Sequence, residues 1–331
     1  MGGTTHVATH HSSTVDAVET RSMKDNRPHQ FISIQDGCPA DFKLCIRSGV
    51  WSDIGNRQYM EDEHVLVDDL EEYLGPEALI TTSGSYYGVF DGHDGKNAAQ
   101  FVKEKLLNYI VSDVAFPIAV EEAVQHAYLE TDAAFANACS LNNALSSGTT
   151  AITVLILARE IFVANAGDCR AVLCRRGKAI EMSRDHKPHV ERSRIEALGG
   201  YIYDGYLNGY LSVARAFGNW HIEGLKGVNC PLIAEPEVRR AVLTPDDEFM
   251  IIGCDGFWDV FTNESAVAFA RRRLQQHNDP EQCSHDLVDE ALRRCSSDNL
   301  TVVTVCFQKS PPPRLFPRFM ARRCMHFEKQ L

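Results

Sequence analysis

The sequence predicts an α+β fold in which layered antiparallel β-sheets are flanked by helices. Apolar residues make up 44% of the 331 residues and charged residues 24%, which leaves ample apolar material for a core. Several apolar stretches with strand character follow one another through connections too short for crossover helices. Amphipathic helical stretches come in pairs before and after these strands. This grouping argues against a doubly wound parallel sheet.

The first predicted elements are a buried strand and two helices. The strand covers residues 86–90, with the sequence YYGVF. An amphipathic helix over 95–113 follows, because apolar residues recur every four positions from Ala98 to Ile110. A second helix fits 119–139.

Four strands and a mixed group of elements follow. Because the turns between the four strands are short, we expect them to form an antiparallel meander. They are predicted over residues 149–158, 160–167, 169–174 and 179–183. A short helix stopped by glycine fits residues 190–200. The remaining elements are a strand, two helices and a closing strand, predicted over residues 248–254, 263–276, 284–295 and 300–307.

The periodic pattern is continuous over residues 43–308, which predicts a single domain. Residues 1–42 are rich in Ser, Thr, His and Asp without a sustained period, and are expected to form a flexible arm. Residues 309–331 begin near a Pro-Pro-Pro run and are basic, so they are expected to form a tail that contributes little to the core. A nucleic-acid-binding role would rest on this tail and the arm alone, and a solvated end is the favoured interpretation.

Charge and cysteine content narrow the class of protein. The net charge of −12 argues against a nucleic-acid-binding surface and suits a protein that holds cations. The eleven cysteines are odd in number and include no Cys-x-x-Cys pair, which indicates a reducing compartment, the cytoplasm and/or the nucleus. No apolar run approaches the ~20 residues that span a bilayer, so no membrane partner is expected.

Aspartates stand at the ends of several predicted strands. Asp91, Asp168 and Asp255 each end an apolar run, and Asp298 immediately precedes the last strand. Each one alone is ordinary turn chemistry. If the fold brings them together, their repulsion requires divalent cations, and oxygen ligands favour Mg²⁺ or Mn²⁺. The EF-hand spacing is broken and a P-loop is absent.

Nine ordered blocks carry a resemblance to a known family. They read NRQYMEDEHV, VFDGHDG, SSGTT, VANAGDCRAVL, SRDHKP, RIEALGG, LSVARAFGN, CDGFWDV and SDNLTVV. Between about residues 46 and 307 the chain resembles the metal-dependent protein serine/threonine phosphatases of type 2C. The sequences of these blocks most resemble those of the plant branch of the family. The resemblance implies a four-layer α-β-β-α sandwich with two central antiparallel sheets. It also implies a hydrolase with a signalling role, acting on phosphorylated proteins and expected to be a monomer.

The same resemblance implies a centre with two Mg²⁺ or Mn²⁺ ions per subunit and a weaker third position. Asp91 matches the carboxylate that bridges both ions, and Gly92 supplies a carbonyl ligand. Asp255 and Asp298 match ligands of the second ion. The other implied acidic residues surround the centre: Glu61 and Asp62 hold metal-bound waters, and Asp168, with Asp255 and Asp259, matches the third position.

Two further residues match catalytic positions of the family. Arg57 resembles the arginine that grips the substrate phosphate, for which its planar fork is suited. His93 resembles the general acid, which donates a proton to the leaving serine or threonine oxygen. These roles fit hydrolysis by a metal-activated water, a route that lowers a very large barrier.

Two positions in these blocks depart from the family pattern. Asp94 follows the Asp-Gly-His triplet where a small residue is usual, and Asn219 ends the RAFGN block where aspartate is usual. The alternative function is a catalytically impaired pseudophosphatase that binds phosphoproteins. The presence of Asp91, Asp255, Asp298 and Arg57 favours the enzyme.

Overall fold

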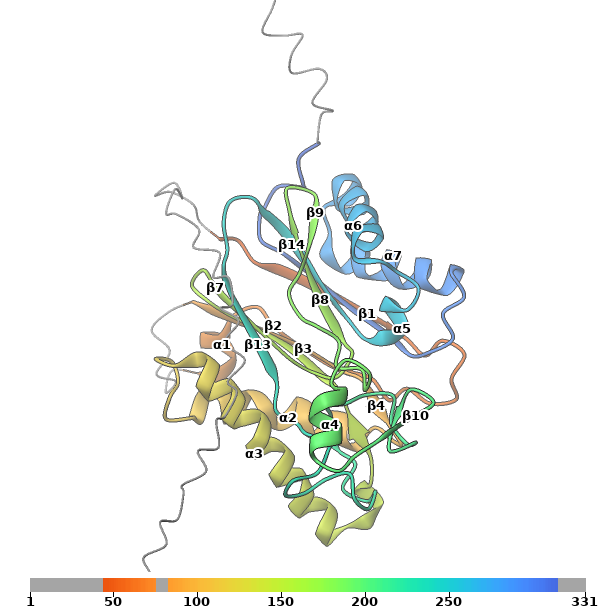
Figure 1. Ribbon diagram of the computed structural model, residues 1–331. Coiled ribbons are helices and arrows are strands. Elements are labelled where there is room, and N and C mark those ends of the chain that lie inside the picture. Colours follow the sequence, from red (N-terminus) through yellow and green to blue (C-terminus); the bar gives the residue numbers. More distant parts are fainter. Residues whose placement is uncertain (1–43, 76–82, 315–331) are drawn as a thin grey trace, which may run out of the picture. The chain divides into compact units, whose positions relative to one another are not determined.

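Two five-stranded antiparallel sheets form the centre of the protein, seen here in a computed structural model that describes residues 44–75 and 83–314 (Figure 1). The first sheet has the order β1 (Arg47–Asp53), β15 (Leu300–Cys306), β14 (Asp247–Gly253), β8 (Arg170–Arg175) and β9 (Lys178–Glu181). The second has the order β13 (Glu237–Val242), β7 (Glu160–Ala166), β6 (Ala151–Leu157), β3 (Gly84–Phe90) and β2 (Glu63–Val67). The predicted arm, 1–42, and most of the predicted tail lie outside the described residues.

Helices cover the outer face of each sheet and complete four layers. α2 (Asn97–Ser112) and α3 (Val120–Leu141) pack on the second sheet, and α6 (Asn263–His277) and α7 (Pro280–Arg293) pack on the first. A short helix, α1 (Leu70–Leu74), follows β2. The α-β-β-α sandwich expected from the sequence is confirmed.

Strand β3 shows how the layers are held together. All seven of its residues are buried. Tyr87 and Val89 enter the core between the two sheets, whereas Tyr86 and Phe90 enter the core beneath α2 and α3. Successive side chains of a strand point to opposite faces, so a strand covered on both faces has no polar side.

The chain changes sheets between β7 and β8, where the prediction of one continuous meander is wrong. β6 and β7 pair in the second sheet, whereas β8 pairs with β9 and β14 in the first. Gly167 makes the bend with φ of +129°, and a Cβ there would lie 2.3 Å from Cβ of Thr150. The bend carries Asp168 across from one sheet to the other.

The other predicted elements are confirmed with shifted ends. α7 begins at Pro280 and not at residue 284, because Asp279 accepts hydrogen bonds from the backbone of Glu281 and Gln282 and proline suits the first turn. α5 (Asp255–Trp258) is a short helix that the sequence pattern did not predict.

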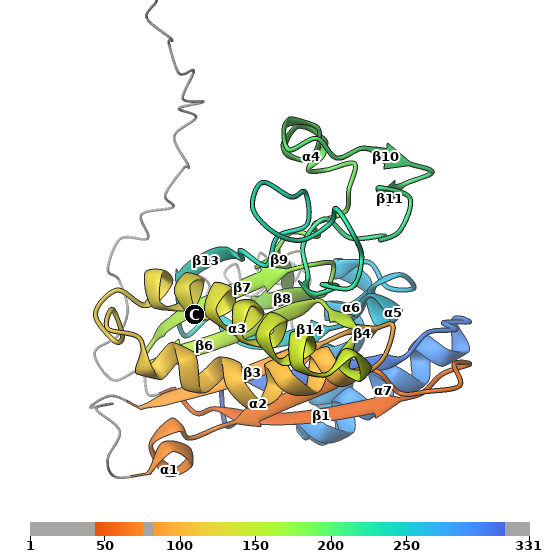
Figure 2. The same cartoon turned by 90° about the horizontal axis from the view of Figure 1, so that it is seen from below.

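A separate lobe lies between β9 and β13. It contains α4 (Arg192–Ala197) and the hairpin of β10 (Ile202–Tyr203) and β11 (Tyr206–Leu207), and it has its own apolar cluster around Ile195, Leu207 and Leu225. Figure 2 shows α4 and the hairpin extending from the side of the sandwich. A small three-stranded sheet joins β4 (Gly92–His93), β5 (Gly148–Thr149) and β12 (Phe217–Gly218). The 3-10 helix η1 (Asn143–Leu145) lies just before β5. Among the described residues, no helix has both the length and the apolar character needed to cross a bilayer.

Candidate metal and phosphate site

Strand register brings the predicted acidic residues to one end of the two sheets. In the first sheet, Gly253 at the end of β14 pairs with Val302 of β15 on one side and with Arg170 of β8 on the other. Asp255 therefore follows the end of β14, whereas Asp298 and Asp168 precede the starts of the two neighbouring strands. In the second sheet, Glu63 pairs with Phe90, which places Asp62 beside Asp91. Residues far apart in sequence therefore meet at this edge.

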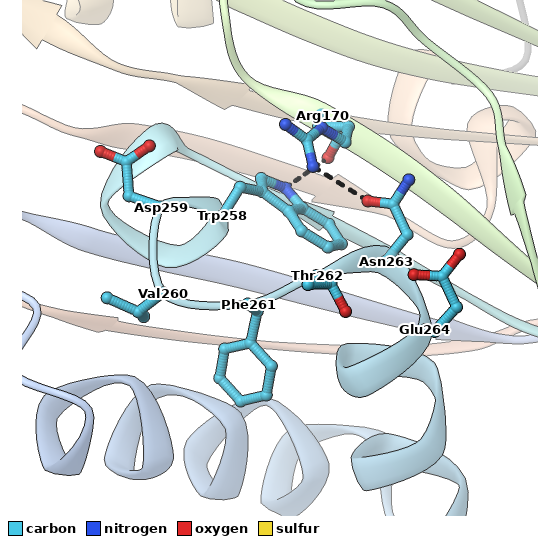
Figure 3. A pocket seen from close by; sticks show the side chains of 8 residues that line it. All are labelled: Arg170, Trp258, Asp259, Val260, Phe261, Thr262, Asn263 and Glu264. Carbon is cyan, nitrogen blue, oxygen red and sulfur yellow. Dashed lines mark hydrogen bonds between the residues drawn. The ribbon is translucent and has the colours of Figure 1, made fainter.

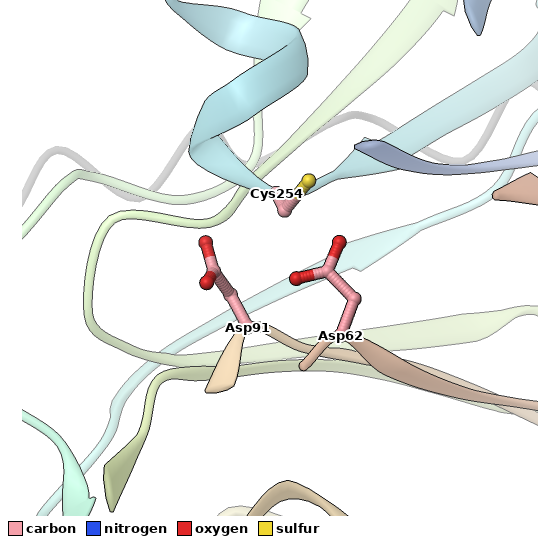
Figure 4. A group of neighbouring side chains, drawn as sticks. All are labelled: Asp62, Asp91 and Cys254. Carbon is pink, nitrogen blue, oxygen red and sulfur yellow. The ribbon is translucent and has the colours of Figure 1, made fainter. Parts of the chain in front are cut away.

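Asp62 and Asp91 form one compact group with Cys254 (Figure 4). One ligand atom from each of the three lies within 4.8 Å of the others. Both carboxylate oxygens of Asp62 are buried and have no hydrogen-bond partner among the described residues. The Cys254 thiol donates to the carbonyl of Asn299 at 3.4 Å and accepts from the Thr301 amide at 3.2 Å. The thiol is thus engaged with the backbone, and the free ligand atoms here are oxygens.

Asp91 also belongs to a second group, with Asp168 and Asp255. Their carboxylate oxygens lie within 4.8 Å of one another. Asp91 is the member that the two groups share, which is the arrangement a bridging carboxylate requires. Hard divalent cations such as Mg²⁺ and Mn²⁺ take oxygen ligands of this kind.

Burial and mutual repulsion shift the pKa values of these carboxyl groups upwards. Burial raises the pKa of Asp62 to about 6; the neighbouring Thr301 hydroxyl and Cys254 thiol act to lower the pKa, and the charges of Asp298 and Glu61 act to raise it. Burial and the Asp168 carboxylate raise the pKa of Asp255 to about 7. Burial and then Asp255 also raise the pKa of Asp91 well above its ordinary value. The cluster is short of positive charge, which bound cations would supply.

Lys187 is a cation that sequence reasoning did not assign to the site. Its Nζ lies 2.5 Å from Oδ2 of the buried Asp168 and 3.9 Å from Oδ2 of Asp255. Burial alone would lower the pKa of Lys187, but the two carboxylates outweigh burial and raise it. The residue stands in the SRDHKP block, whose lysine could have been noted as a charge facing the aspartates.

Arg57 lies at the open side of the cluster. Its Nη2 donates to Oδ2 of Asp298 at 2.6 Å, and the two side chains are 59% and 37% exposed. Exposed ion pairs contribute at most about 1 kcal/mol. The guanidinium can therefore exchange this carboxylate for another anion at small cost.

Gly92 and Glu61 are in close backbone contact. A Cβ on Gly92 would lie 2.4 Å from the carbonyl oxygen of Glu61. The amide of Glu61 in turn donates to the side chain of Asn299 at 2.8 Å, and this side chain also donates to the carbonyls of Ile54 and Tyr59. Asn299 thus fixes the segment that carries Glu61 and Asp62, a role that the sequence did not indicate.

The side chain of His93 contacts that of Asn219. Its Nε2 is 2.9 Å from Oδ1 of Asn219. The neighbouring Asp94 has φ of +57°, and its carboxylate lies 3.9 Å from Nε2 of His221. The charged residue that departs from the expected pattern therefore faces the lobe segment that carries His221.

Comparison with known proteins decides the family. Residues 47–300 match the family model described as Protein phosphatase 2C. The chain belongs to the protein phosphatase 2C family. It is 57% identical over 288 residues to the Oryza sativa subsp. japonica protein named "Probable protein phosphatase 2C 57", covering 86% of this chain and 78% of that protein.

A second relative supports this assignment, and a solved structure supports the fold. The chain is 54% identical over 297 residues to "Probable protein phosphatase 2C 22" of Arabidopsis thaliana, covering 87% of this chain and 76% of that protein. Its fold is similar to the crystal structure of a serine-threonine phosphatase 2C from Toxoplasma gondii, with a TM-score of 0.67 and 24% identity over 82% of this chain and 97% of that one. The chain is thus a plant-type, metal-dependent protein serine/threonine phosphatase.

A pocket of about 450 Å³ is lined by eight residues that include Arg170, Trp258 and Asp259 (Figure 3). Arg170, on the pocket wall, binds the Asp185 carboxylate with two nitrogens at 3.0 and 2.7 Å, contacts Asn263 at 2.9 Å and lies over the Trp258 ring. Its donors are used in structural contacts. Asp259 is exposed and lies outside both compact carboxylate groups.

Proposed function

We propose that this phosphatase hydrolyses phosphoserine and phosphothreonine in proteins at a centre with two Mg²⁺ or Mn²⁺ ions, and that it acts in signalling. Asp91, Gly92, Asp255 and Asp298 would hold the ions, with Asp91 common to both groups of ligand atoms. Glu61 and Asp62 hold water at the centre. Asp168, with Asp255 and Asp259, forms a weaker third position.

The observation that carries this proposal is the pair of buried oxygens on Asp62, which lie near the Thr301 hydroxyl and the Cys254 thiol but accept no hydrogen bond of normal geometry from the described residues. A buried carboxylate without a hydrogen bond is costly, and such groups are ordinarily paired, protonated or near a metal. The second group, of Asp91, Asp168 and Asp255, holds further oxygens within 4.8 Å. These residues fit hard divalent cations without any change of ligand type.

When bound, two divalent cations supply a water of lowered pKa and stabilise the phosphoryl oxygens during in-line attack. Arg57 orients the phosphate through two parallel N–H donors, releasing Asp298 as it does so. His93 gives a proton to the serine or threonine oxygen as that oxygen leaves. No observation on the described residues supports the alternative of a binding protein without turnover.

The remaining expectations are part of the same proposal. Residues 43–308 form the catalytic domain, with the arm 1–42 and the tail 309–331 outside it. Phosphorylated proteins are the substrates, and the protein works as a monomer, without nucleic acid or membrane, in the cytoplasm and/or the nucleus. The net charge of −12 supports the absence of a nucleic-acid partner. The odd number of cysteines, with no Cys-x-x-Cys pair, supports a reducing compartment.

Calorimetric titration with Mn²⁺ tests the metal centre directly. The metal-free protein should bind two ions tightly at pH 7.5, and Asp62→Asn should weaken binding because an amide offers one neutral oxygen in place of a carboxylate. A matched control is Asp69→Asn, which changes a helix cap away from the cluster. Binding of one ion alone, or equal isotherms for Asp62→Asn and wild type, would contradict the proposal.

A further inference from the structure

The small sheet β12-β5-β4 brings Asn219 to the proposed general acid. In this sheet His93 pairs with Gly148, and Gly218 pairs with the same Gly148 from the other side. Asn219 follows Gly218 directly, and its Oδ1 reaches Nε2 of His93 at 2.9 Å. The contact is thus a consequence of strand register.

Gly148 leaves the space in which this contact is made. A Cβ at position 148 would lie 2.1 Å from Oδ1 of Asn219 and 2.2 Å from Nε2 of His93. No real side chain fits at those distances. A residue other than glycine would push the two groups apart.

The backbone around Asn219 is held from several directions. The residue is fully buried, with φ of +61°, and its amide donates to the carbonyl of Ser147 at 2.8 Å. The amide of Gly218 donates to Asp132 on α3 at 2.7 Å, and Lys226 binds the other oxygen of that carboxylate at 2.7 Å. The position of the Asn219 side chain is therefore set by the fold and not by the ligand.

The contact also decides which nitrogen of His93 carries a hydrogen. An amide oxygen can accept but not donate, so with the Asn219 amide in this orientation the hydrogen bond requires a hydrogen on Nε2. The side-chain nitrogen of Asn219 is buried with no partner among the described residues, so the contact with His93 is the side-chain hydrogen bond that Asn219 makes there. Within the described part of the chain Nδ1 makes no hydrogen bond, so it is the ring nitrogen left to act on a substrate.

We propose that Asn219 is a positioning residue that holds His93 so that Nδ1 donates the proton in phosphoester cleavage. This rests on the proposed role of His93 as the general acid. As the P–O bond breaks, its electron pair goes to the leaving oxygen, which takes the proton from Nδ1. Phosphorus gains the oxygen of the attacking water; one proton of that water passes to solvent and the other leaves with the phosphate. The imidazolium becomes the neutral tautomer with hydrogen on Nε2, the form that Asn219 already binds, and solvent restores the Nδ1 proton.

The test compares two substrates with different need for an acid. A threonine alkoxide leaves poorly without a proton, whereas p-nitrophenolate is a stable anion. Asn219→Gly removes the amide and keeps a backbone that tolerates positive φ. General acids contribute roughly 10²–10⁴-fold, so this variant should lower the kcat ratio of phosphothreonine peptide to p-nitrophenyl phosphate about tenfold or more. Asn219→Asp retains an acceptor oxygen and should restore the ratio of the two kcat values. Titration of both variants with Mn²⁺ should give the wild-type isotherm.

His93→Ala separates failure of this inference from failure of the proposed function. If His93→Ala lowers the substrate ratio but Asn219→Gly lowers both substrates equally or neither, the positioning role is wrong and the general acid stands. If His93→Ala leaves the ratio unchanged, the acid assignment itself is wrong and the inference falls with it. Should Asn219→Gly fail to fold, Asn219→Ser and Asn219→Asp provide the same comparison, and equal ratios for those two would overturn the proposal.

Discussion

The ammonium group of Lys187 lies 2.5 Å from the carboxylate of Asp168 and 3.9 Å from that of Asp255. Asp168 is almost completely buried and also belongs to the group of oxygens expected to bind cations. The chain therefore carries its own positive charge next to the proposed third metal position. A divalent cation that binds Asp168 has to compete with this lysine.

Replacing Lys187 should strengthen the weakest cation site. Lys187→Met keeps the length of the side chain and removes its charge, so a Mn²⁺ ion near Asp168 no longer meets a competing cation. Calorimetric titration should show tighter weak-phase binding than in wild type, and Lys187→Arg should resemble wild type. In EDTA, Lys187→Met should melt at a lower temperature because the buried Asp168 loses its partner. Identical isotherms for Lys187→Met and wild type would show that Lys187 does not compete with Mn²⁺ for Asp168.

The metal-free protein should lose stability as the pH rises through 6 and 7. Asp62 and Asp255 have pKa values raised to about 6 and about 7, above the ordinary value of 3.8. Between pH 3.8 and the raised pKa of each group, the folded state binds more protons than the unfolded state. The free energy of unfolding therefore falls as the pH rises through this range. Thermal melting in EDTA at pH 5.5 and 8 measures this.

Asp62→Asn is the variant that isolates the effect. It removes one carboxyl group that must be buried with charge, so at pH 8 in EDTA its melting temperature should exceed that of wild type by at least ~2 °C, about what 1 kcal/mol gives a domain of this size. At pH 5.5 the difference should shrink. A larger difference at the lower pH would contradict the assigned direction of the pKa shift.

Arg57→Ala should impair the reaction without weakening metal binding. Loss of the two-pronged donor should lower kcat/KM for a phosphothreonine peptide on the order of 10²-fold. Mn²⁺ affinity should not fall, because the change removes a positive charge from beside Asp298. Arg57→Lys keeps the charge without the bidentate donor, so its kcat/KM should lie between those of wild type and Arg57→Ala. A parallel loss of Mn²⁺ affinity would make Arg57 a support of the metal ligands.

The start of the C-terminal segment should matter for stability, whereas residues 315–331 should not. Within the described part, Asn278 donates to the carbonyl of Lys309 at 2.9 Å, and Arg271 and Gln275 donate to that of Pro313. Deleting residues 309–331 should therefore lower the melting temperature more than deleting 315–331. Equal melting curves for the two truncations would show that these contacts to α6 contribute nothing.

Strand ends were predictable where the local sequence decides them. Asp91 follows a fully buried strand, and Asp255 follows another, so their place at the sheet edge could be read from hydrophobic pattern and turn chemistry. The change of sheets at Gly167 could not, because two hairpins look alike in sequence whether they lie in one sheet or two. It is nevertheless this change that delivers Asp168 to the cluster.

Contacts between distant segments could not be predicted either, because the local sequence does not show which segments meet in the fold. Asn219 touches His93 across 126 positions, and Asn299 fixes the Glu61 backbone across 238. Neither residue has a local pattern that indicates its partner. The family resemblance marked Asn219 as unusual, but the register with Gly148 was needed to show what it contacts.

The most direct test of the account is phosphate release from a phosphothreonine peptide by wild type, Asp255→Asn and Asp246→Asn. Asp246 is a matched control, since it makes an exposed ion pair with Arg176 just before the opposite end of β14. Wild type and Asp246→Asn should be active with Mn²⁺, inactive in EDTA and active again when Mn²⁺ is restored, while Asp255→Asn should be inactive throughout. Full activity of wild type after exhaustive chelation, or near-normal kcat for Asp255→Asn, would contradict the metal-dependent site described here.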